Sequence, residues 1–508
     1  MGRICISVSA ETSSDFVVKT RVAFSKASAV ELRFDSLDSK ELDDVLEQLS
    51  YERAAYDGVV IGTFRSSVNG QGGKRELSAE EIGAFWRTPK LRSIVDIVDV
   101  ESGMDVSLPG HYSSVIRSHH DFDSIPSGAL ESLADRFHDP GSARRKRIAK
   151  IAGFASDITD AIPFWQLQKD YPGILPIAMG QFGSWFRILS ISQGAPFTYA
   201  SLSEKQSTAP GQISFDDLAD VYRAESLTSS TEIYGIVALK ASSSISPYIH
   251  NAAFRDGGRD AVYIPLSVKD CEGFYTRMAA PGTREIDWNL KGLSVTLPHK
   301  ETFAGLVDKL DGEAAEIGAV NTVRIDDGRT IGFNTDARGF FLPLRKKLGT
   351  VKGLKAGIIG SGGAAKAAAY ALSEANSEVV IFSRSPENAR EMQDRFGADV
   401  RPLSSDVKAF EDLDIIINAS PIGSLGELES LSPVPAECLE NLQLAYDLVY
   451  NPISTRFLRD AENAGIPTLG GLDMLIEQAL LQYEIWTGSS ASRETMMHAA
   501  KSRIGSLT

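Results

Sequence analysis

Charged side chains stand inside or directly after several short apolar runs in the first half of the chain. Lys150 lies within RIAKIAGF, and His120 follows the preceding run, SSVIRS. An ammonium in an apolar run is poorly solvated, so we expect the pKa of Lys150 to fall. A lysine that has lost its proton can form an imine with a ketone, and a histidine beside it can move protons near neutral pH. These two residues favour a Schiff-base lyase, either an aldolase or a dehydratase.

Five more polar side chains end or follow the neighbouring runs. They are Glu31, Arg33, Arg65, Arg187 and Gln212. Each of the seven residues has a structural explanation when taken alone, because a lysine stem can lie along an apolar wall and a charge at a strand end is usually solvated. Seven that converge on one opening are better explained by a binding site for a polar substrate.

Eight apolar, β-rich runs that alternate with amphipathic helical segments carry these side chains. The runs cover residues 3–8, 29–34, 57–64, 93–100, 113–118, 147–153, 174–180 and 196–202. Eight such alternations predict an α/β fold, a (β/α)8 TIM barrel over residues 1–226. Because barrel active sites lie at the carboxyl ends of the strands, we expect the seven side chains to meet at one mouth.

Five segments of this half resemble the type I 3-dehydroquinate dehydratases in order and spacing. The segments are VELRFD, TFR, SHHDF, KIAGFASDITD and APGQ, and the similarity covers nearly the whole first half. The resemblance implies that Lys150 forms the imine with the substrate ketone and that His120 removes the proton from the adjacent carbon and helps water leave. It also implies that the other five residues hold the substrate hydroxyls and carboxylate, with Arg187 as a two-pronged donor.

Two positions depart from that family. The family has a glutamate that orients the histidine after the third-strand arginine, where this chain has Asn69 or Gln71 in FRSSVNGQGG. Thr208 stands where the family commonly has a serine, which keeps a hydroxyl for the substrate. The orientation of His120 and its pH dependence are therefore open.

A glycine-rich turn in the second half predicts a dinucleotide site. In AGIIGSGGAAKA, Gly360, Gly362 and Gly363 allow a tight turn and close approach of the backbone to a pyrophosphate at a helix N-terminus. The next strand, EVVIF, ends at Arg384 between two serines. An acid here favours NAD, whereas arginine with small hydroxyls suits the 2′-phosphate, so we predict NADP (NADPH). The alternative is that Arg384 is an ordinary surface residue.

Most of residues 233–490 resembles the shikimate dehydrogenases. The matching segments include YGIVALKASSSISPYIHNAAF, SVTLPHK, GAVNT, GFNTDARGF, INASPIG and GLDMLIEQALLQYEIWTG. The resemblance implies a two-domain α/β fold. A substrate-binding domain at 232–338 would be joined by C-terminal helices at about 472–508, and a Rossmann NADP-binding domain would cover 339–471.

Within that fold, the resemblance implies that Lys300 and Asp336 are the catalytic pair. Reduction of a ketone develops negative charge on oxygen, so a cation and a proton donor should face it, and a carboxylate beside the lysine keeps it charged and aimed. The implied substrate contacts are Ser244, Ser246, Thr296, Asn321, Tyr450 and Gln478. The implied nucleotide contacts are Gly360, Ser361, Gly362, Gly363, Ala364, Ser383, Arg384, Ser385, Asn418, Ala419, Ser420 and Met474. Lys240 and the two residues before it replace a usual glycine and proline, which leaves the choice between shikimate and quinate open.

Length and composition fit a cytoplasmic protein of several domains. The chain has 508 residues, 43% of them hydrophobic, and a formal net charge of −15. That charge argues against nucleic acid as a partner, no apolar run approaches the roughly 20 residues that span a bilayer, and the N-terminus does not resemble a signal peptide. Cys5, Cys271 and Cys438 are far apart and form no CxxC, so we expect neither disulfides nor a metal site.

Together, the halves predict two consecutive steps of the shikimate pathway, toward chorismate and the aromatic amino acids. The first half would dehydrate 3-dehydroquinate to 3-dehydroshikimate, and the second would reduce that product to shikimate with NADPH, so we expect small-molecule partners. Three alternatives stay open: an aldolase in the first half, a quinate dehydrogenase in the second, or a catalytically inactive regulator that senses a metabolite. The presence of Lys150, His120, Lys300 and Asp336 argues against the regulator.

Overall fold

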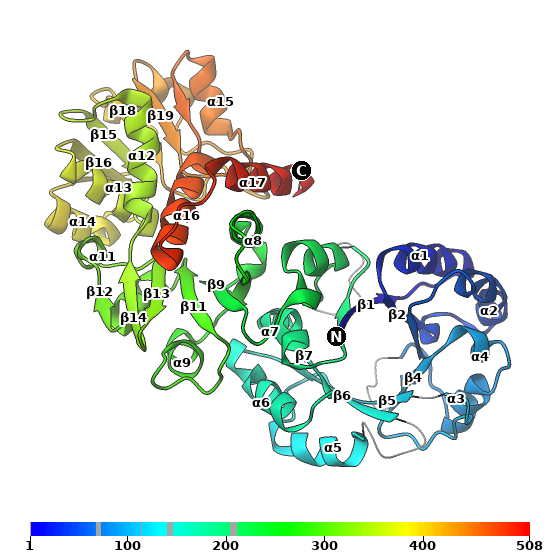
Figure 1. The fold of residues 1–508 in the computed structure, drawn as a ribbon. Helices are drawn as coiled ribbons and strands as arrows, with labels where there is room; N and C mark the ends of the chain where they lie inside the picture. The colour runs from blue at the N-terminus through cyan, green and yellow to red at the C-terminus, as the bar shows by residue number, and fades with distance from the viewer. Residues whose placement is uncertain (1, 68–72, 113, 140–145, 204–210, 508) are drawn as a thin grey trace.

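The chain folds around three β-sheets that follow one another in sequence (Figure 1). A computed structural model describes residues 2–67, 73–112, 114–139, 146–203 and 211–507. The first sheet has eight strands, and the other two have six each. The first sheet is built from the first half of the chain and the other two from the second half.

The first sheet is a nearly closed parallel barrel. Its strands are β1 (Arg3–Val8), β2 (Ala29–Arg33), β3 (Val59–Thr63), β4 (Ile97–Glu101), β5 (Ser114–Asp121), β6 (Lys146–Phe154), β7 (Leu175–Met179) and β8 (Phe197–Ala200). They pair in the order β7-β6-β5-β4-β3-β2-β1-β8, and all of these pairs are parallel. The predicted barrel is confirmed. One strand starts later than predicted, because Leu91–Ile94 forms the short helix α4 before β4.

Helices with one apolar side cover the barrel strands. They are α1 (Ser13–Lys26), α2 (Ser39–Arg53), α3 (Ala79–Trp86), α4, α5 (Leu130–Phe137), α6 (Ile162–Asp170) and α7 (Ser184–Leu189). Ser78 and Glu81 form a reciprocal capping box that starts α3. At the other end of α3, the indole of Trp86 lies against β3 at Gly62, where a Cβ would come within 2.8 Å of the ring. Glycine at that position therefore lets the helix pack closely on the barrel.

The second sheet is mixed and is completed by the C-terminal helices. Its strands are β9 (Glu232–Ala238), β10 (Ala261–Ser267), β11 (Leu290–Val295), β12 (Lys309–Leu310), β13 (Thr322–Asp326) and β14 (Arg329–Phe333), in the order β10-β9-β11-β13-β14-β12. Its helices are α8 (Ser246–Asp256), α9 (Cys271–Phe274), α10 (Lys300–Leu306), α11 (Gly312–Ile317), and α16 (Gly471–Thr487) and α17 (Arg493–Leu507) from the chain end. Trp486 of α16 anchors this return, because its Nε1 donates to the carbonyl of Val323 (2.9 Å).

The third sheet is parallel and doubly wound. Its strands are β15 (Lys355–Ile359), β16 (Glu378–Ser383), β17 (Asp399–Pro402), β18 (Ile415–Asn418), β19 (Leu444–Asp447) and β20 (Thr468–Leu469), in the order β17-β16-β15-β18-β19-β20. Its helices are α12 (Asp336–Leu348), α13 (Gly363–Glu374), α14 (Arg390–Phe396) and α15 (Arg456–Asn463). The strand order reverses between β15 and β18, and Rossmann folds bind nucleotides at such a switch point. This agrees with the predicted Rossmann fold.

The barrel and the second sheet share one continuous hydrophobic core. Trp185 of α7 and Trp288, which precedes β11, are both buried and meet edge to face with ring centroids 5.5 Å apart. Polar contacts border this core. Tyr248 of α8 donates from its hydroxyl to Asp217 Oδ1 (2.8 Å), and Asp157, after β6, accepts from two backbone amides that follow β10. The two halves are therefore packed directly against each other.

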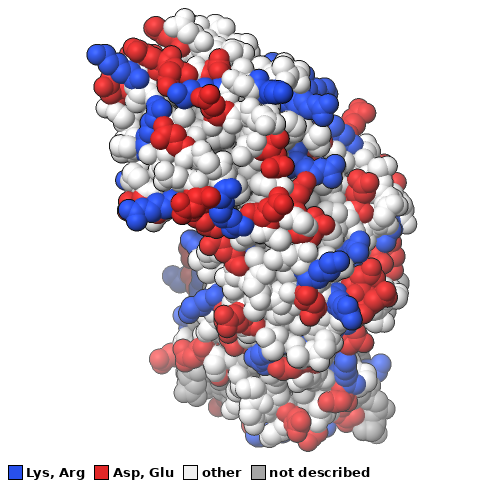
Figure 2. All heavy atoms as spheres, turned by 90° about the vertical axis from the view of Figure 1, so that its left-hand side faces the viewer, with Lys and Arg blue, Asp and Glu red and all other residues white. Residues whose placement is uncertain are grey.

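Charges of both signs are intermixed on the face that Figure 2 presents. The net charge of −15 is therefore not gathered into one acidic block on that face. Among the described residues, no helix has the length and apolar character needed to cross a membrane. In the same ranges, no three His, Cys, Asp or Glu side chains are grouped so that they could hold a metal ion.

Candidate active sites

A cavity of about 140 Å³ lies toward the carboxyl ends of the barrel strands. It is lined by every predicted dehydratase residue that the structure describes: Glu31, Arg33, Arg65, His120, Lys150, Arg187 and Gln212. Thr208, Asn69 and Gln71 lie outside the described residues. The parallel barrel thus brings together, at one mouth, side chains from six strands or from the segments that follow them.

Lys150 is buried within β6 and is paired with two carboxylates. Its side chain is 7% exposed, its Nζ donates to Asp99 Oδ2 (2.9 Å) and lies 3.8 Å from Glu31 Oε1, and the Tyr199 ring centre is 4.4 Å away. Burial alone would raise the pKa of Asp99 and of Glu31, but Lys150 and nearby arginines outweigh it and hold both pKa values below the ordinary range. Two ionised carboxylates therefore hold the amino group of Lys150 in the cavity. The sequence prediction considered burial of the lysine alone.

His120, near the end of β5, is held between a carboxylate and a guanidinium. Its Nδ1 lies 3.1 Å from Glu101 Oε2, and its Nε2 lies 3.2 Å from Arg65 Nη1. Because a guanidinium can only donate, Nε2 accepts, and Nδ1 carries the proton that is donated to Glu101. Burial, with the nearby cations Arg65 and Lys150, lowers the pKa of His120 well below its ordinary value. The ring is therefore a neutral base with a fixed tautomer.

Glu101, at the end of β4, supplies an orienting carboxylate of the kind that the family pattern places after Arg65. Burial raises the pKa of Glu101 to about 7; Asp99 adds to this effect and Arg65, 3.5 Å away, opposes it. The sequence prediction missed both acids as site residues. The sequence did contain a signal for them: like Lys150 in RIAKIAGF, Asp99 and Glu101 are charged residues in an otherwise apolar run, IVDVE.

Arg187 is buried in this cavity and differs in its partners from the other cations that line it. Its Nε donates to the carbonyl of Ala178 (3.0 Å), which fixes the guanidinium plane, and burial lowers its pKa to about 10. It has no carboxylate partner among the described residues. Arg33, in contrast, is paired with Asp35 (2.7 Å). A bound anion would therefore complete the surroundings of Arg187.

A second cavity, of about 290 Å³, is lined by residues of the second and third sheets and their helices. All predicted catalytic and substrate-binding residues of the second half line it: Ser244, Ser246, Thr296, Lys300, Asn321, Asp336, Tyr450 and Gln478. Ala364 and Met474, predicted as nucleotide contacts, line the same cavity, so it adjoins the glycine-rich turn. Gln482, which the sequence prediction missed, and Lys240, which departs from the family pattern, also line it.

Lys300 and Asp336, the first residues of α10 and α12, form a close ion pair in this cavity. Lys300 Nζ lies 2.5 Å from Asp336 Oδ2, and Asp336 Oδ1 accepts from Asn321 Nδ2 (2.8 Å). Asn321 is itself fixed, because its Oδ1 accepts from the backbone amide of Thr335 (2.8 Å). The carboxylate orientation is therefore set by the fold, and it aims the cation. Such a pair can stabilise an oxyanion and supply a proton.

The glycine-rich turn between β15 and α13 lies at the switch point of the third sheet. Gly360 has φ +119°, and a Cβ there would come 2.9 Å from the Ala419 carbonyl oxygen, so only glycine fits. A Cβ at Gly362 would meet no atom within 4 Å. Ser383, at the end of β16, has its Oγ 3.3 Å from Ser361 Oγ and so ties that strand end to the turn. The backbone is therefore shaped as an open cradle at the start of a helix.

Arg384 is exposed next to this cradle and has no ion-pair partner among the described residues. Asn418 differs from the other predicted nucleotide contacts. It is fully buried, and its amide donates to Asp447 Oδ1 and to the carbonyl of Ile422 (both 2.9 Å), so it shapes the loop at Ala419 and Ser420. The open cradle and the exposed arginine fit an NADP molecule.

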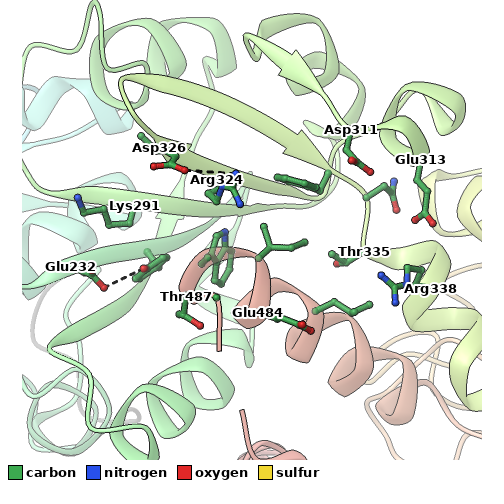
Figure 3. A pocket seen from close by; sticks show the side chains of 18 residues that line it. Glu232, Lys291, Asp311, Glu313, Arg324, Asp326, Thr335, Arg338, Glu484 and Thr487 are labelled. Atoms are coloured by element: carbon green, nitrogen blue, oxygen red, sulfur yellow. Dashed lines mark hydrogen bonds and ion pairs between the residues drawn. The ribbon is translucent and has the colours of Figure 1, made fainter. Parts of the chain in front are cut away.

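A further cavity, of about 740 Å³, lies along the C-terminal part of α16 and contains none of the predicted site residues (Figure 3). Figure 3 shows cations and carboxylates around it, including Lys291, Arg338 and Glu484. Arg324, also in its lining, lies 3.7 Å from Asp326. These exposed and half-exposed charges differ from the buried acid–base pairs of the other two cavities.

The fold and the two sites define a fused enzyme, with a lysine-based lyase on a barrel and a nucleotide-dependent oxidoreductase on a two-domain α/β unit. Residues 4–229 match the type I 3-dehydroquinase family. Residues 236–323 match the shikimate dehydrogenase substrate binding domain, and residues 471–501 match the shikimate 5′-dehydrogenase C-terminal domain. Residues 355–435 match the family of NADP oxidoreductases that are coenzyme F420-dependent.

Relatives cover both halves. The chloroplastic bifunctional 3-dehydroquinate dehydratase/shikimate dehydrogenase of Arabidopsis thaliana is 31% identical over 97% of this chain and 83% of its own length. The NADP⁺ shikimate dehydrogenase of Methanocaldococcus jannaschii is 35% identical over 55% of this chain and 99% of its own. A crystal structure of a shikimate dehydrogenase with NADP⁺ matches 55% of this chain and 97% of its own, with a TM-score of 0.51 and 34% identity.

The chain belongs to the family of bifunctional 3-dehydroquinate dehydratases/shikimate dehydrogenases. It is a shikimate-pathway enzyme with a Schiff-base lyase half and an NADP-dependent oxidoreductase half.

Proposed function

We propose that Lys150 and His120 carry out the dehydration in the barrel cavity. The Lys150 amine condenses with the ketone of 3-dehydroquinate, forms an imine and releases water. His120 takes a proton from the adjacent carbon and returns it to the hydroxyl that leaves as a second water, and hydrolysis of the imine frees 3-dehydroshikimate. The observation that carries this proposal is the position of a buried lysine and a neutral histidine in one cavity.

The remaining barrel residues are proposed to bind and orient. Arg187, which has a fixed guanidinium, would take the substrate carboxylate. Glu101 would keep the His120 proton on Nδ1. The substrate hydroxyls would be held by Glu31, Arg33, Arg65, Gln212 and Thr208.

In the second half, we propose that Lys300 faces the carbonyl oxygen of 3-dehydroshikimate and that Asp336 keeps this lysine charged and aimed. Bound NADPH supplies the hydride. Lys300 stabilises the developing negative charge on oxygen, and the pair delivers the proton. Arg384 would hold the 2′-phosphate of NADP. The proposed contacts for the substrate carboxylate and ring hydroxyls are Ser244, Ser246, Thr296, Asn321, Tyr450 and Gln478.

We also propose three structural units, with boundaries at 1–226, at 232–338 together with about 472–508, and at 339–471. One sheet in each unit supports this division. Small molecules are the proposed partners of both sites. A cytoplasmic location is proposed because the three cysteines are all free and buried.

A two-step optical assay on the purified chain tests the function. 3-Dehydroquinate alone should produce the conjugated enone of 3-dehydroshikimate, and added NADPH should then be oxidised. NADPH loss only with supplied 3-dehydroshikimate would contradict the barrel proposal. A faster rate with quinate and NADP⁺ than with shikimate and NADP⁺ would favour a quinate dehydrogenase, and silence from both halves would favour a regulator.

A further inference from the structure

A barrel loop touches the second sheet at a place that leads directly to the reductase lysine. Asp157 lies three residues beyond β6, the strand that carries Lys150. Its Oδ2 accepts from the backbone amides of Lys269 (2.9 Å) and Asp270 (3.0 Å), which follow β10. Its Oδ1 accepts from Thr159 N (3.4 Å) inside the barrel. One carboxylate therefore caps a barrel turn and fixes a segment of the other half.

The segment that Asp157 fixes is itself bonded to the residue before Lys300. Val268, the residue before Lys269, is fully buried, and its carbonyl accepts from His299 Nε2 (3.0 Å). Because a carbonyl can only accept, His299 must carry a proton on Nε2. Burial lowers the pKa of His299, so the ring is neutral and holds its position through this hydrogen bond rather than through a charge.

His299 is the residue from which α10 and its first residue, Lys300, start. Its backbone amide donates to the carbonyl of Thr296 (3.0 Å), and its carbonyl accepts from Phe303 N (2.9 Å). These bonds shape the turn internally. The ring of His299 connects the turn to the end of β10 through its hydrogen bond to the Val268 carbonyl. A shift of Val268 would therefore move the Lys300 backbone relative to Asp336, which belongs to another element.

We propose that Asp157 of the dehydratase barrel is a positioning residue for the reductase, and that it acts through Val268 and His299 on Lys300. This inference rests on the proposed role of Lys300 in the reduction. The substrate serines are on a different segment from Lys300: Ser244 lies between β9 and α8, and Ser246 is the first residue of α8. The loss of Asp157 should therefore lower the rate of reduction more than it weakens substrate binding.

The variant that tests this most sharply is Asp157→Ser in the full chain. A serine hydroxyl can still cap the barrel turn at Thr159, but it is too short to reach the Lys269 and Asp270 amides. We expect the reductase kcat to fall about tenfold, since small misplacements remote from the chemistry can cost up to about 10²-fold. The KM for 3-dehydroshikimate should change less than about twofold, and dehydratase activity, measured on the same sample, should be unchanged.

Two variants serve as matched controls. Asp157→Asn keeps an oxygen that can accept from both amides, and it should restore most of kcat. Arg223→Ala removes a barrel contact at the opposite end of β10, where Arg223 Nη2 donates to the Ala261 carbonyl (3.3 Å), and it should leave both activities unchanged. A reductase loss in Arg223→Ala equal to that in Asp157→Ser would overturn the proposal, because any damage to the interface would then suffice.

A double-mutant cycle tests whether Asp157 acts on Lys300 through His299. His299→Phe removes the bond to Val268, so adding Asp157→Ser to it should cost little more; fully additive losses would refute action through His299. Lys300→Ala tests the underlying role independently. If Lys300→Ala abolishes reduction while Asp157→Ser keeps wild-type kcat, this inference fails and the proposed function stands. If Lys300→Ala keeps wild-type activity, the proposed function fails first.

Discussion

Replacing Glu101 with glutamine should disturb the orientation and tautomer of His120 while leaving the other residues of the dehydratase site in place. In the wild type, the Glu101 carboxylate accepts from His120 Nδ1 (3.1 Å) and lies 3.5 Å from Arg65 Nε. Both contacts are made by Oε2, and the other oxygen, Oε1, lies 3.3 Å from His120 Nδ1. In glutamine, an NH₂ group replaces one of these oxygens, and in either orientation it lies near Nδ1. An NH₂ group can only donate, so it opposes the Nδ1 proton and favours the tautomer in which Nδ1 accepts and the basic lone pair is on the wrong nitrogen.

The expected loss follows from the role of the base. A positioned general acid or base contributes about 10²–10⁴-fold, so we expect the dehydratase kcat of Glu101→Gln to fall by about 10²-fold, or about 2.7 kcal/mol. The pH profile should change as well. Burial raises the pKa of Glu101 to about 7, so the carboxylate that fixes the tautomer forms as pH rises through that value. Wild-type kcat/KM should rise with it, and the variant should lack this limb.

Enone formation, measured on both sides of pH 7, checks both effects. Reductase activity of the same preparation reports whether the variant is folded. Glu225→Gln is the matched control, because Glu225 accepts from the backbone amide of Ile4 (2.8 Å) at the start of β1, away from the cavity. A Glu101→Gln enzyme with wild-type kcat and an intact limb near pH 7 would refute the orientation role. An equal loss of both activities would indicate general destabilisation instead.

Three further outcomes are expected. The folded barrel holds the Glu101 proton more tightly than an unfolded chain does, because the pKa of Glu101 is about 7 in the fold and 4.5 for an ordinary carboxyl; this stabilisation is present below pH 4.5 and is lost as pH rises through about 7. In urea unfolding, the free energy of unfolding of the wild type should fall by roughly 3 kcal/mol relative to that of Glu101→Gln over this pH range. Parallel pH dependences of the two proteins would contradict this expectation. Borohydride with 3-dehydroquinate should add a stable substrate mass to wild type and none to Lys150→Ala, whereas equal labelling would disprove the imine assignment. Arg384→Ala should weaken NADPH binding at least about tenfold more than NADH binding, and an equal effect on both would mean that Arg384 does not contact the phosphate.

The periodicity of the sequence predicted which residues meet, but it predicted less about how they are paired. Runs that alternate with helices locate the ends of parallel strands, and this was enough to place Lys150 and His120 in one cavity. Their partners Asp99 and Glu101 were missed because their run was interpreted for its apolar residues alone. The start of β4 was also placed too early, since the residues before it have apolar character but form the helix α4.

Contacts between the halves could not be predicted from local pattern at all. Asp157 resembles an ordinary helix cap in the sequence, and it does cap a turn. Its second role depends on the packing of the barrel against β10, which no period in the sequence encodes. The same holds for His299, whose ring is aimed by a carbonyl 31 residues away in the chain. Side chains that act across an interface need the tertiary structure to be recognised.

The way in which the halves are connected determines what controls the transfer of 3-dehydroshikimate from one active site to the other. With a flexible tether, the effective concentration of one site at the other depends on linker length and stiffness. Residues 226–232, whose Ser/Thr-rich composition predicts a linker, are held here: Thr231 Oγ1 donates to Asp260 Oδ1 (2.8 Å), and Asn289 Nδ2 donates to the Ser230 carbonyl (2.8 Å). The buried contact between Trp185 and Trp288 joins the two cores. The relative placement of the two mouths is therefore set by packing, so any advantage in transfer must come from that fixed placement and not from the length of the connecting segment.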